Sequence, residues 1–435
     1  MVGTEGLMLR GGGRPLAARP GPGTAARRDS GRRPGHEAVA GPAAAEAPAR
    51  RLRAAILGWQ RSFPGLPYRL PRRDRLQGVR CVGQGAGARV SGVLAPLLRH
   101  DVSTGAGATV IELRGGGLAG PARGAADRAG RAVLEWEPGN PDSACWNPLA
   151  RPTPAAAERL EQALRRLGGH AAPGQAAAPR GPDPLLRHAV AAVASCGRVP
   201  DLLALQRFLE ASPSRQAELA MGDAAAARYF RDVCRRWSAD RREGRLGAFL
   251  GPLAVLLGQP LLRRALCPGD GAPVIDLPAC LREGRVLLAT LPPGGPSGVG
   301  EALGGLLLAA FQAAAYGRAP GAPFHALYVD DPERLAGGRL DGFVRAAGSV
   351  GIGAVCGAEG LDRHGGAGDV LGAWGTAVVV RCGPADARAL APALPARRRR
   401  TWVPADLSGL PYGCGLAYRS GRRPWIRVLR LPAAG

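Results

Sequence analysis

A short apolar run that leads straight into a glycine-rich loop constrains the fold of this chain more than any other feature. Val79 to Val82 has the character of a buried strand, and Gly83 to Ser91 has that of a glycine-rich turn running into a helix. Further strand patterns alternate with helical patterns, at 109–113, 132–136, 285–290, 326–330, 353–356 and 377–381. Strands connected through helices pair in parallel, so the sequence predicts an α/β fold with a parallel sheet covered by helices.

The segments outside this alternation differ in composition. Residues 1–48 are rich in Gly, Pro, Ala and Arg and are predicted to be a disordered tail. Residues 49–78 are predicted to hold a short helix around Leu52 to Trp59, followed by a connector. Residues 151–270 place Leu and Ala at helical spacing without convincing strands, which predicts an all-helical insertion with a disordered tract near 168–183.

The insertion divides the predicted sheet domain into two parts, residues 79–150 and residues 271–435. The second part ends in a basic segment and a pair of strand patterns near 415–418 and 425–429. Its longest apolar run, Ala302 to Tyr316, is shorter than the ~20 residues that a membrane span needs. We therefore expect a buried core helix there and no integral membrane segment.

The charge balance points to a polyanionic partner. The sequence holds 58 basic residues, none of them lysine, against 34 acidic residues, for a formal net charge of +24. Such an excess suits DNA, RNA or an acidic membrane surface. The codon bias of a GC-rich genome also replaces lysine with arginine, but it does not explain an excess of arginine over acids. We therefore favour contact with a nucleic acid.

The cysteine and histidine patterns argue against several kinds of site. The nine cysteines are scattered with no CxxC pair, which indicates neither a zinc site nor a disulfide framework. The six histidines form no HExxH or similar cluster. The N-terminal region lacks the apolar segment of a secretory leader, so a cytoplasmic location is expected.

The loop at 83–91 has the glycines of a phosphate-binding loop but lacks its most diagnostic side chains. Three glycines permit the tight turn in which backbone N–H groups and a helix end cradle phosphate: Gly83, Gly85 and Gly87. The lysine position holds Arg89, or Ala88 in a register shifted by one residue. Val90 offers no hydroxyl, and Ser91 comes one residue late. In a chain with 66 glycines, such a loop is also common as a plain turn.

Several short motifs follow one another in a recognisable order. They lie at 110–115, 134–149, 276–291, 327–331, 343–359, 375–381 and 406–410, and the most specific ends in Trp146-Asn147-Pro148-Leu149. In this order they resemble the HerA/FtsK-type P-loop ATPases, most closely the conjugative coupling proteins of the TraG/TraD kind, which act in type IV secretion. The resemblance extends over residues 79–430.

This resemblance implies a RecA-like P-loop NTPase sheet with an inserted all-helical domain, ATP and Mg²⁺ as cofactors, and a DNA-handling homo-hexamer. Asp330 would hold the magnesium ion. Asp331 stands where the family has the glutamate that polarises the attacking water, and its shorter side chain would place that water badly. The alternative for Asp330 is an acid that caps a helix starting at Pro332.

Three further positions receive roles from the same resemblance. Glu359 stands where the family has a glutamine that senses the γ-phosphate. Arg345 and Arg381 would stabilise phosphate charge, across a subunit interface as arginine fingers. The alternatives are an exposed loop glutamate and two solvated or salt-bridged arginines.

The departures from the family pattern fall together on the catalytic positions. They affect the loop lysine, the loop hydroxyl, the water-polarising glutamate and the sensor glutamine. We therefore predict a DNA-associated motor-type protein with weakened or lost ATP hydrolysis. Two alternatives stay open: a non-catalytic assembly subunit beside an active paralogue, and an active DNA-translocating ATPase with Arg89 in place of lysine.

A basic cluster near the C-terminus is the candidate nucleic-acid contact. It consists of Arg397, Arg398, Arg399 and Arg400. Trp402 lies beside it, and basic groups next to aromatic rings suit single-stranded nucleic acid. A solvated run of charge is the alternative.

Overall fold

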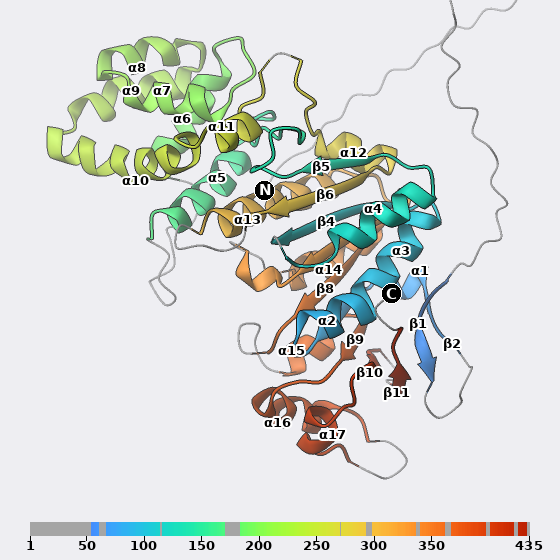
Figure 1. Ribbon diagram of the computed structural model, residues 1–435. Helices are drawn as coiled ribbons and strands as arrows, with labels where there is room; N and C mark the ends of the chain where they lie inside the picture. Colours follow the sequence, from blue (N-terminus) through green and yellow to red (C-terminus); the bar gives the residue numbers. More distant parts are fainter. Residues whose placement is uncertain are drawn as a thin grey trace, which may run out of the picture. The chain divides into compact units, whose positions relative to one another are not determined.

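A mixed sheet of eleven strands organises the described residues of the computed structural model (Figure 1). The structure describes residues 54–60, 67–113, 115–169, 183–269, 271–292, 298–335, 340–361, 367–396, 401–421 and 425–432. The strands are β1 (Ala54–Gln60), β2 (Pro67–Pro71), β3 (Val79–Val82), β4 (Gly107–Leu113), β5 (Val133–Trp136), β6 (Val286–Leu291), β7 (His325–Asp330), β8 (Ile352–Ala358), β9 (Thr376–Val379), β10 (Cys414–Arg419) and β11 (Trp425–Arg430). Their order across the sheet is β2-β1-β11-β10-β9-β3-β8-β7-β4-β6-β5.

The seven strands from β9 to β5 pair in parallel. Every residue of β4, β6, β7 and β8 is buried, as expected for parallel strands covered on both faces. These strands confirm the predicted parallel sheet. Because they run in one direction, the segments that follow β3, β7, β8 and β9 all begin at the same edge, which we call the carboxyl edge. Strand β8 lies between β3 and β7.

Four antiparallel strands extend the sheet beyond β9, and one of them corrects a prediction. β10 pairs with β9 and β11, which confirms the predicted C-terminal strand pair. β1 pairs with β11 and β2, so the helix predicted around Leu52 to Trp59 is wrong. The apolar spacing in this segment suits a helix, but residues such as Ile56 and Trp59 also favour strands. Pairing with a strand from the far end of the chain decides between the two.

Helices are the main elements of the region between Thr153 and Cys267, which lies between β5 and β6 (Figure 1). They are α5 (Pro154–Leu167), α6 (Pro184–Ala194), α7 (Leu202–Glu210), α8 (Pro213–Leu219), α9 (Ala224–Asp232), α10 (Ala239–Leu257) and α11 (Pro260–Leu266). Six of them begin at a side chain that accepts a hydrogen bond from a backbone N–H of the first turn: Thr153, Asp183, Asp201, Ser212, Asp223 and Ser238.

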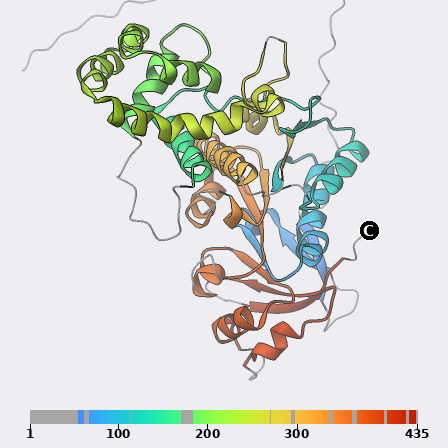
Figure 2. The same cartoon turned by 60° about the vertical axis from the view of Figure 1, so that its left-hand side comes forward.

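Figure 2 shows α6 to α10 gathered into a bundle of their own, with α5 leading towards α13. The all-helical insertion of the predicted fold is therefore confirmed, whereas its bounds, residues 151–270, stay a prediction. Most of the tract near 168–183 lies outside the described residues.

Helices cover both faces of the parallel strands. α3 (Ala95–Ser103) and α4 (Ala119–Arg128) pack on one face. α12 (Leu277–Glu283), α13 (Val299–Tyr316) and α14 (Asp341–Ala347) pack on the other. The remaining α-helices are α1 (Arg72–Arg75), α2 (Ala86–Arg89), α15 (Ala367–Gly372), α16 (Pro384–Ala393) and α17 (Pro404–Ser408).

α13 matches the apolar run for which a core helix is predicted. By length and composition it could cross a membrane, a property that core helices share, and 67% of it is buried. Its leucines and Phe311 lie in the same hydrophobic cluster as residues of β4, β6 and β7. The prediction of a buried core helix is confirmed.

A buried ionic contact fixes α3 against β7. The guanidinium of Arg75 donates to both carboxylate oxygens of Asp101, and the Tyr328 hydroxyl donates to Asp101 Oδ2 over 2.6 Å. These three side chains belong to residues that are at most 3% exposed. α3 continues the helix that begins after the glycine loop, and β7 ends at Asp330. The contact therefore helps to set the position of the loop helix relative to the strand that carries the two acids.

A buried histidine at the start of β7 makes stability depend on pH. His325 is fully buried, and its Nε2 lies 2.9 Å from Thr109 Oγ1. Burial first, and then the charges of Arg318 and Arg131, lower its pKa to about 3. Between about pH 3 and the ordinary histidine pKa of ~6.5, His325 binds a proton in the unfolded chain but not in the folded chain. Stability is therefore lost as the pH falls through this range.

We expect His325→Gln to flatten the acid limb of the unfolding free energy by up to about 1.4 kcal/mol per pH unit. Urea unfolding at several pH values from about 7.5 to about 4.5, a range that spans the ordinary histidine pKa of ~6.5, measures how steeply the free energy of unfolding depends on pH. At the alkaline end, where the histidine is neutral in both states, the two proteins should differ only by a constant. Equal slopes on the acid side would contradict the assignment.

Candidate functional site

The loop between β3 and the helix after it consists of three residues, Gly83 to Gly85. A Cβ on Gly83 would come within 2.4 Å of Val380 and 2.8 Å of the Arg381 carbonyl oxygen. Gly85 has φ +84°, which side chains rarely allow. The N–H of Gln84 donates to the Arg381 carbonyl over 2.8 Å. Close packing at Gly83 and the positive φ of Gly85 therefore require glycine at both positions.

The helix after the loop presents its N-terminus at the carboxyl edge. α2 continues without a break as a π-helical turn, Val90–Leu94, and then as α3. Residues 84–87 are exposed, and a Cβ on Gly87 would meet nothing within 4 Å. The first N–H groups of a helix have no partner within the helix and attract anions. Ser91 lies half-buried in the π-helical turn. This arrangement can hold an anion in front of α2.

Two acidic residues follow each other at the end of β7. Asp330 is its last residue and is 7% exposed. Asp331 has φ 51°, and it is the one non-glycine residue with positive φ in the described part of the chain. Such a conformation costs up to about 1–3 kcal/mol and is found at active sites as well as in turns, where Asp tolerates it better than most residues do. The short 3-10 turn that follows, Pro332–Arg334, has no side-chain cap, so these acids do not serve as a cap there.

Arg89 links the loop to both acids. Its Nε donates to Asp330 Oδ1 over 3.4 Å, and its Nη2 donates to both carboxylate oxygens of Asp331 over 3.1 and 3.2 Å. Its Nη1 donates to the carbonyl oxygen of Gly83 over 2.9 Å. Arg89 is only 1% exposed. The site therefore contains a buried cation that belongs to the chain itself.

Burial and charge act against each other at these groups. Burial raises the pKa of Asp330 to about 6, although Arg89 opposes the change. Burial also raises the pKa of Asp331 against the effect of Arg89, and the negative charges of Glu333 and Glu359 add to the increase. Burial disfavours the charged form of Arg89, but the two acids outweigh it, so the pKa of Arg89 is raised. The guanidinium thus stays charged between the two carboxyl groups.

The side chains at this position do not fit a magnesium ion. Mg²⁺ takes a near-octahedral set of oxygen ligands at about 2.0–2.1 Å. Three carboxylate oxygens of Asp330 and Asp331 already accept hydrogen bonds from Arg89. Val90, at the loop position where a hydroxyl would reach a metal, has an apolar side chain. The cation between the two acids is an arginine.

Two further candidate residues lie at the same edge. Glu359 directly follows β8 and is exposed, and Arg381 follows β9 with an exposed side chain. The carbonyl of Arg381 is already hydrogen-bonded to the loop. The fold therefore brings the loop, the two acids, Glu359 and Arg381 to one edge of the sheet. The catalytic roles of these residues stay predictions.

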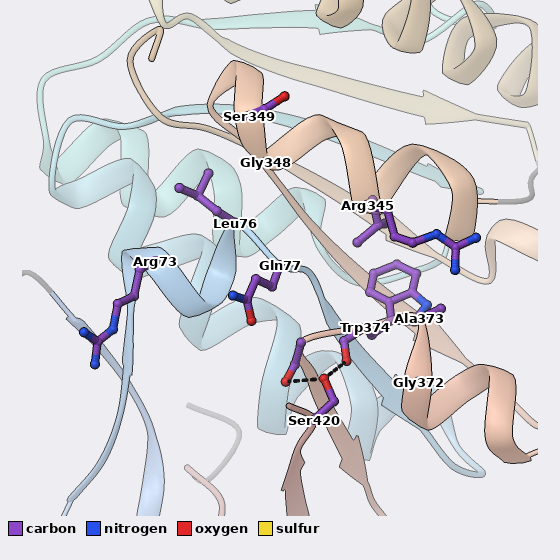
Figure 3. Close-up of a pocket in the computed structure, with 12 residues that line it drawn as sticks. Arg73, Leu76, Gln77, Arg345, Gly348, Ser349, Gly372, Ala373, Trp374 and Ser420 are labelled. Carbon is purple, nitrogen blue, oxygen red and sulfur yellow. Dashed lines mark hydrogen bonds between the residues drawn. The ribbon is translucent and has the colours of Figure 1, made fainter. Parts of the chain in front are cut away.

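Arg345 lies at the opposite edge of the sheet. It is exposed in α14, which precedes β8, and it lines an open cavity of about 500 Å³ (Figure 3). Gln77, Gly375 and Ser420 line the same cavity, and the first two precede β3 and β9. Within one chain, Arg345 is therefore separated from the loop and the two acids. Its proposed action on phosphate would require a neighbouring subunit and stays a prediction.

The basic cluster Arg397 to Arg400 lies outside the described residues, so the predicted nucleic-acid contact is not located. Trp402 beside it is half-buried. Its Nε1 donates to the Pro395 carbonyl over 3.1 Å, and its ring packs against the cluster formed by α16, α17 and β9. Trp402 thus has a packing role in addition to any contact with a base.

One residue that shapes the site was not singled out from the sequence. A Cβ on Gly357, in β8, would come within 2.2 Å of Asp330 Oδ1 and 3.4 Å of Arg89 Nε. Because Gly357 has no side chain, the Asp330 carboxylate can lie against the backbone of β8. A glycine inside an otherwise apolar strand indicates such a close approach, and that signal was present in the sequence.

Structures of the coupling protein TrwB and of VirB4 are among the solved structures that share this fold. The bacterial conjugative coupling protein TrwB, in an unbound form, has a TM-score of 0.59 and 13% identity, over 89% of this chain and 90% of that chain. The plasmid coupling protein TrwB in complex with ADP and Mg²⁺ has a TM-score of 0.57 and 14% identity, over 85% and 88%. VirB4 of Thermoanaerobacter pseudethanolicus has a TM-score of 0.52 and 12% identity, over 87% and 96%.

No protein-family model and no curated protein matches the sequence. The likeness therefore lies in the three-dimensional arrangement, and it extends over most of each compared chain. The resemblance drawn from the short motifs is confirmed at the level of fold: this chain has the RecA-like P-loop fold of the conjugative coupling protein TrwB.

Proposed function

We propose that this chain is a DNA-associated, nucleotide-binding protein of the same motor class as the conjugative coupling proteins, with weakened or lost ATP hydrolysis. One observation carries the proposal. A glycine loop and a pair of acids occupy one edge of a TrwB-like sheet, and Arg89 bridges them by ion pairs at 3.1 and 3.4 Å. The loop and the helix behind it suit a phosphate group.

The side chains around that loop explain why hydrolysis would be weak. In the HerA/FtsK-type ATPases that the sequence resembles, a glutamate polarises the attacking water. Asp331 carries the same charge on a shorter side chain, and it is hydrogen-bonded to Arg89. Glu359 would repel a γ-phosphate that a glutamine would bind. A reacting group that is misplaced by about 1 Å can lose ~100-fold in rate. Several such changes at one site favour nucleotide binding without turnover.

Two kinds of support favour DNA and a ring-shaped assembly. The net charge of +24 suits a nucleic acid and would make binding depend strongly on salt. The resemblance to HerA/FtsK-type ATPases favours a homo-hexamer, in which Arg345 and Arg381 could reach a neighbouring site. The cluster Arg397 to Arg400 is the proposed contact with single-stranded DNA.

A second candidate function is a non-catalytic subunit that assembles beside an active paralogue. The burial of Arg89 favours it, because a guanidinium held by both acids stabilises the fold without any nucleotide. Measuring the molecular mass in solution, alone and with such a paralogue, separates the two candidates. A ring formed by this chain alone favours the first, and a ring that needs the paralogue favours the second.

The proposal is tested by measuring ATP binding and turnover of the full chain, with and without DNA. We expect nucleotide and DNA binding but no DNA-stimulated turnover, in the wild-type protein and in Asp330→Asn alike. Asp240→Asn, at an exposed position at the start of α10, serves as the matched control. DNA-stimulated turnover that Asp330→Asn abolishes would instead show an active translocase with Arg89 in the loop. A protein that binds neither ATP nor DNA would refute the proposal.

A further inference from the structure

We propose that Arg89 is the resident cation of this site: its guanidinium takes the place between the loop and the two acids, so a phosphate ligand is bound without a divalent metal. The statement about the ligand rests on the proposed function. The statement about the metal rests on the geometry of Arg89, Asp330 and Asp331 alone.

The guanidinium of Arg89 donates hydrogen bonds to three residues. The planar guanidinium directs Nε to Asp330, Nη2 to Asp331 and Nη1 to the carbonyl of Gly83. A planar fork with several fixed donors suits such a set of oxygens, whereas lysine offers a single ammonium group. The Arg89 side chain is 2% exposed, so these protein oxygens hold most of its hydrogen-bonding capacity.

The surroundings hold both acids in position for this cation. Asp330 Oδ1 lies where a Cβ on Gly357 would be, so the absence of a side chain in β8 permits its position. The N–H of Asp331 donates to the carbonyl of Gly357 over 2.9 Å, while its left-handed backbone turns the carboxylate towards Arg89. The site is thus built around the guanidinium from β7, β8 and the loop.

A divalent metal would have to compete with Arg89 for the same oxygens. Mg²⁺ bonded to Asp330 and Asp331 would displace the guanidinium, which would leave a buried cation without its partners. Mg²⁺ also loses its hydration water reluctantly. The buried ion pair therefore favours arginine over the metal. An anionic ligand would bind in front of α2, where the first N–H groups of the helix have no partner within the helix.

The experiment measures metal binding without nucleotide. The full-length wild-type chain and Arg89→Ala are titrated with Mn²⁺ as a spectroscopic substitute for Mg²⁺, and thermal unfolding is recorded in Mg²⁺ and in EDTA. Arg263→Ala, which changes an exposed arginine of α11, is the matched control. We expect no Mn²⁺ binding and no change in melting temperature for the wild type and the control. Arg89→Ala should melt lower in EDTA, bind Mn²⁺ and recover part of its melting temperature in Mg²⁺.

Three outcomes would overturn the proposal. They are stoichiometric Mn²⁺ binding by the wild type, a melting temperature of the wild type that rises in Mg²⁺, and an Arg89→Ala protein that folds but gains no metal. If Arg89→Ala does not fold, Arg89→Lys replaces it, since a single ammonium group cannot hold both acids and should also admit the metal.

A second titration tests the ligand. Binding of ADP to the wild type should be equal in Mg²⁺ and in EDTA, and tightening by Mg²⁺ of about tenfold, or 1.4 kcal/mol, would overturn metal-independent binding. Absence of ADP binding under both conditions would refute the proposed nucleotide function. The titrations with metal alone would still decide whether Arg89 is the resident cation.

Discussion

Arg75→Ala is expected to lower the free energy of unfolding by about 3–5 kcal/mol, the usual cost of removing one partner of a buried ion pair. Arg75 donates to both oxygens of Asp101, and these residues are 3% and 2% exposed. Without the guanidinium, the Asp101 carboxylate keeps only the 2.6 Å hydrogen bond from Tyr328 among these contacts. Urea unfolding followed by far-UV circular dichroism measures the loss.

Two further variants isolate the cause of this effect. Arg73→Ala removes an arginine two positions away whose side chain is 80% exposed and lies 3.6 Å from Asp74, so it should cost less than about 1 kcal/mol. Replacing all three buried partners, with Arg75→Met, Asp101→Leu and Tyr328→Phe, should recover most of the stability, because neither a charge nor a buried hydroxyl is then left unpaired. If Arg75→Ala costs no more than Arg73→Ala, the buried contact does not stabilise the fold.

Gly357→Ala is the second change with a large expected effect, because it acts on the fold and on the site together. The added methyl would lie 2.2 Å from Asp330 Oδ1, so either the carboxylate or β8 must move. Overpacking of this kind costs about 1–3 kcal/mol. It should also separate Asp330 from Arg89, which now lies 3.4 Å away.

Urea unfolding gives the loss of stability, and the Mn²⁺ titration described for Arg89→Ala reports on the opened site. Gly87→Ala is the matched control, since a Cβ there has nothing within 4 Å and alanine suits a helix. Equal unfolding midpoints for Gly357→Ala and Gly87→Ala would contradict the close packing of Asp330 against β8.

Most of the parallel sheet can be predicted from the sequence, because each of its strands has a recognisable local sequence pattern. Runs such as Val79 to Val82 and Ala326 to Asp330 are apolar, short and bounded by helical patterns, and they become β3 and β7 with small shifts at their ends. β1 is different, because its stability depends on pairing with β11 at the far end of the chain. Spacing within Ile56 to Trp59 carries no information about that partner, so the local pattern suggests a helix.

The same distinction applies to the site. The sequence shows the glycine loop, Arg89 and the two acids, and it shows the order in which they follow one another. The contact between Arg89 and Asp330 joins residues 241 positions apart, and its geometry depends on the bare backbone at Gly357. Arg345 lies in a motif that resembles the HerA/FtsK-type ATPases, but only the fold shows that it lies at the edge of the sheet opposite the loop. Side-chain direction is set by neighbours that a linear motif does not contain.

The position of β11 between β1 and β10 has a consequence for synthesis of the protein on the ribosome. The β1–β2 hairpin leaves the ribosome before the other strands of the sheet, but its partner β11 is made after all of them, at Trp425–Arg430. At about 5–20 residues per second, β1 waits on the order of tens of seconds with an open edge. An unpaired strand edge invites pairing with other chains. Nascent chains on one messenger are therefore exposed to mispairing until β11 has been made, and a truncated product without β11 never closes that edge.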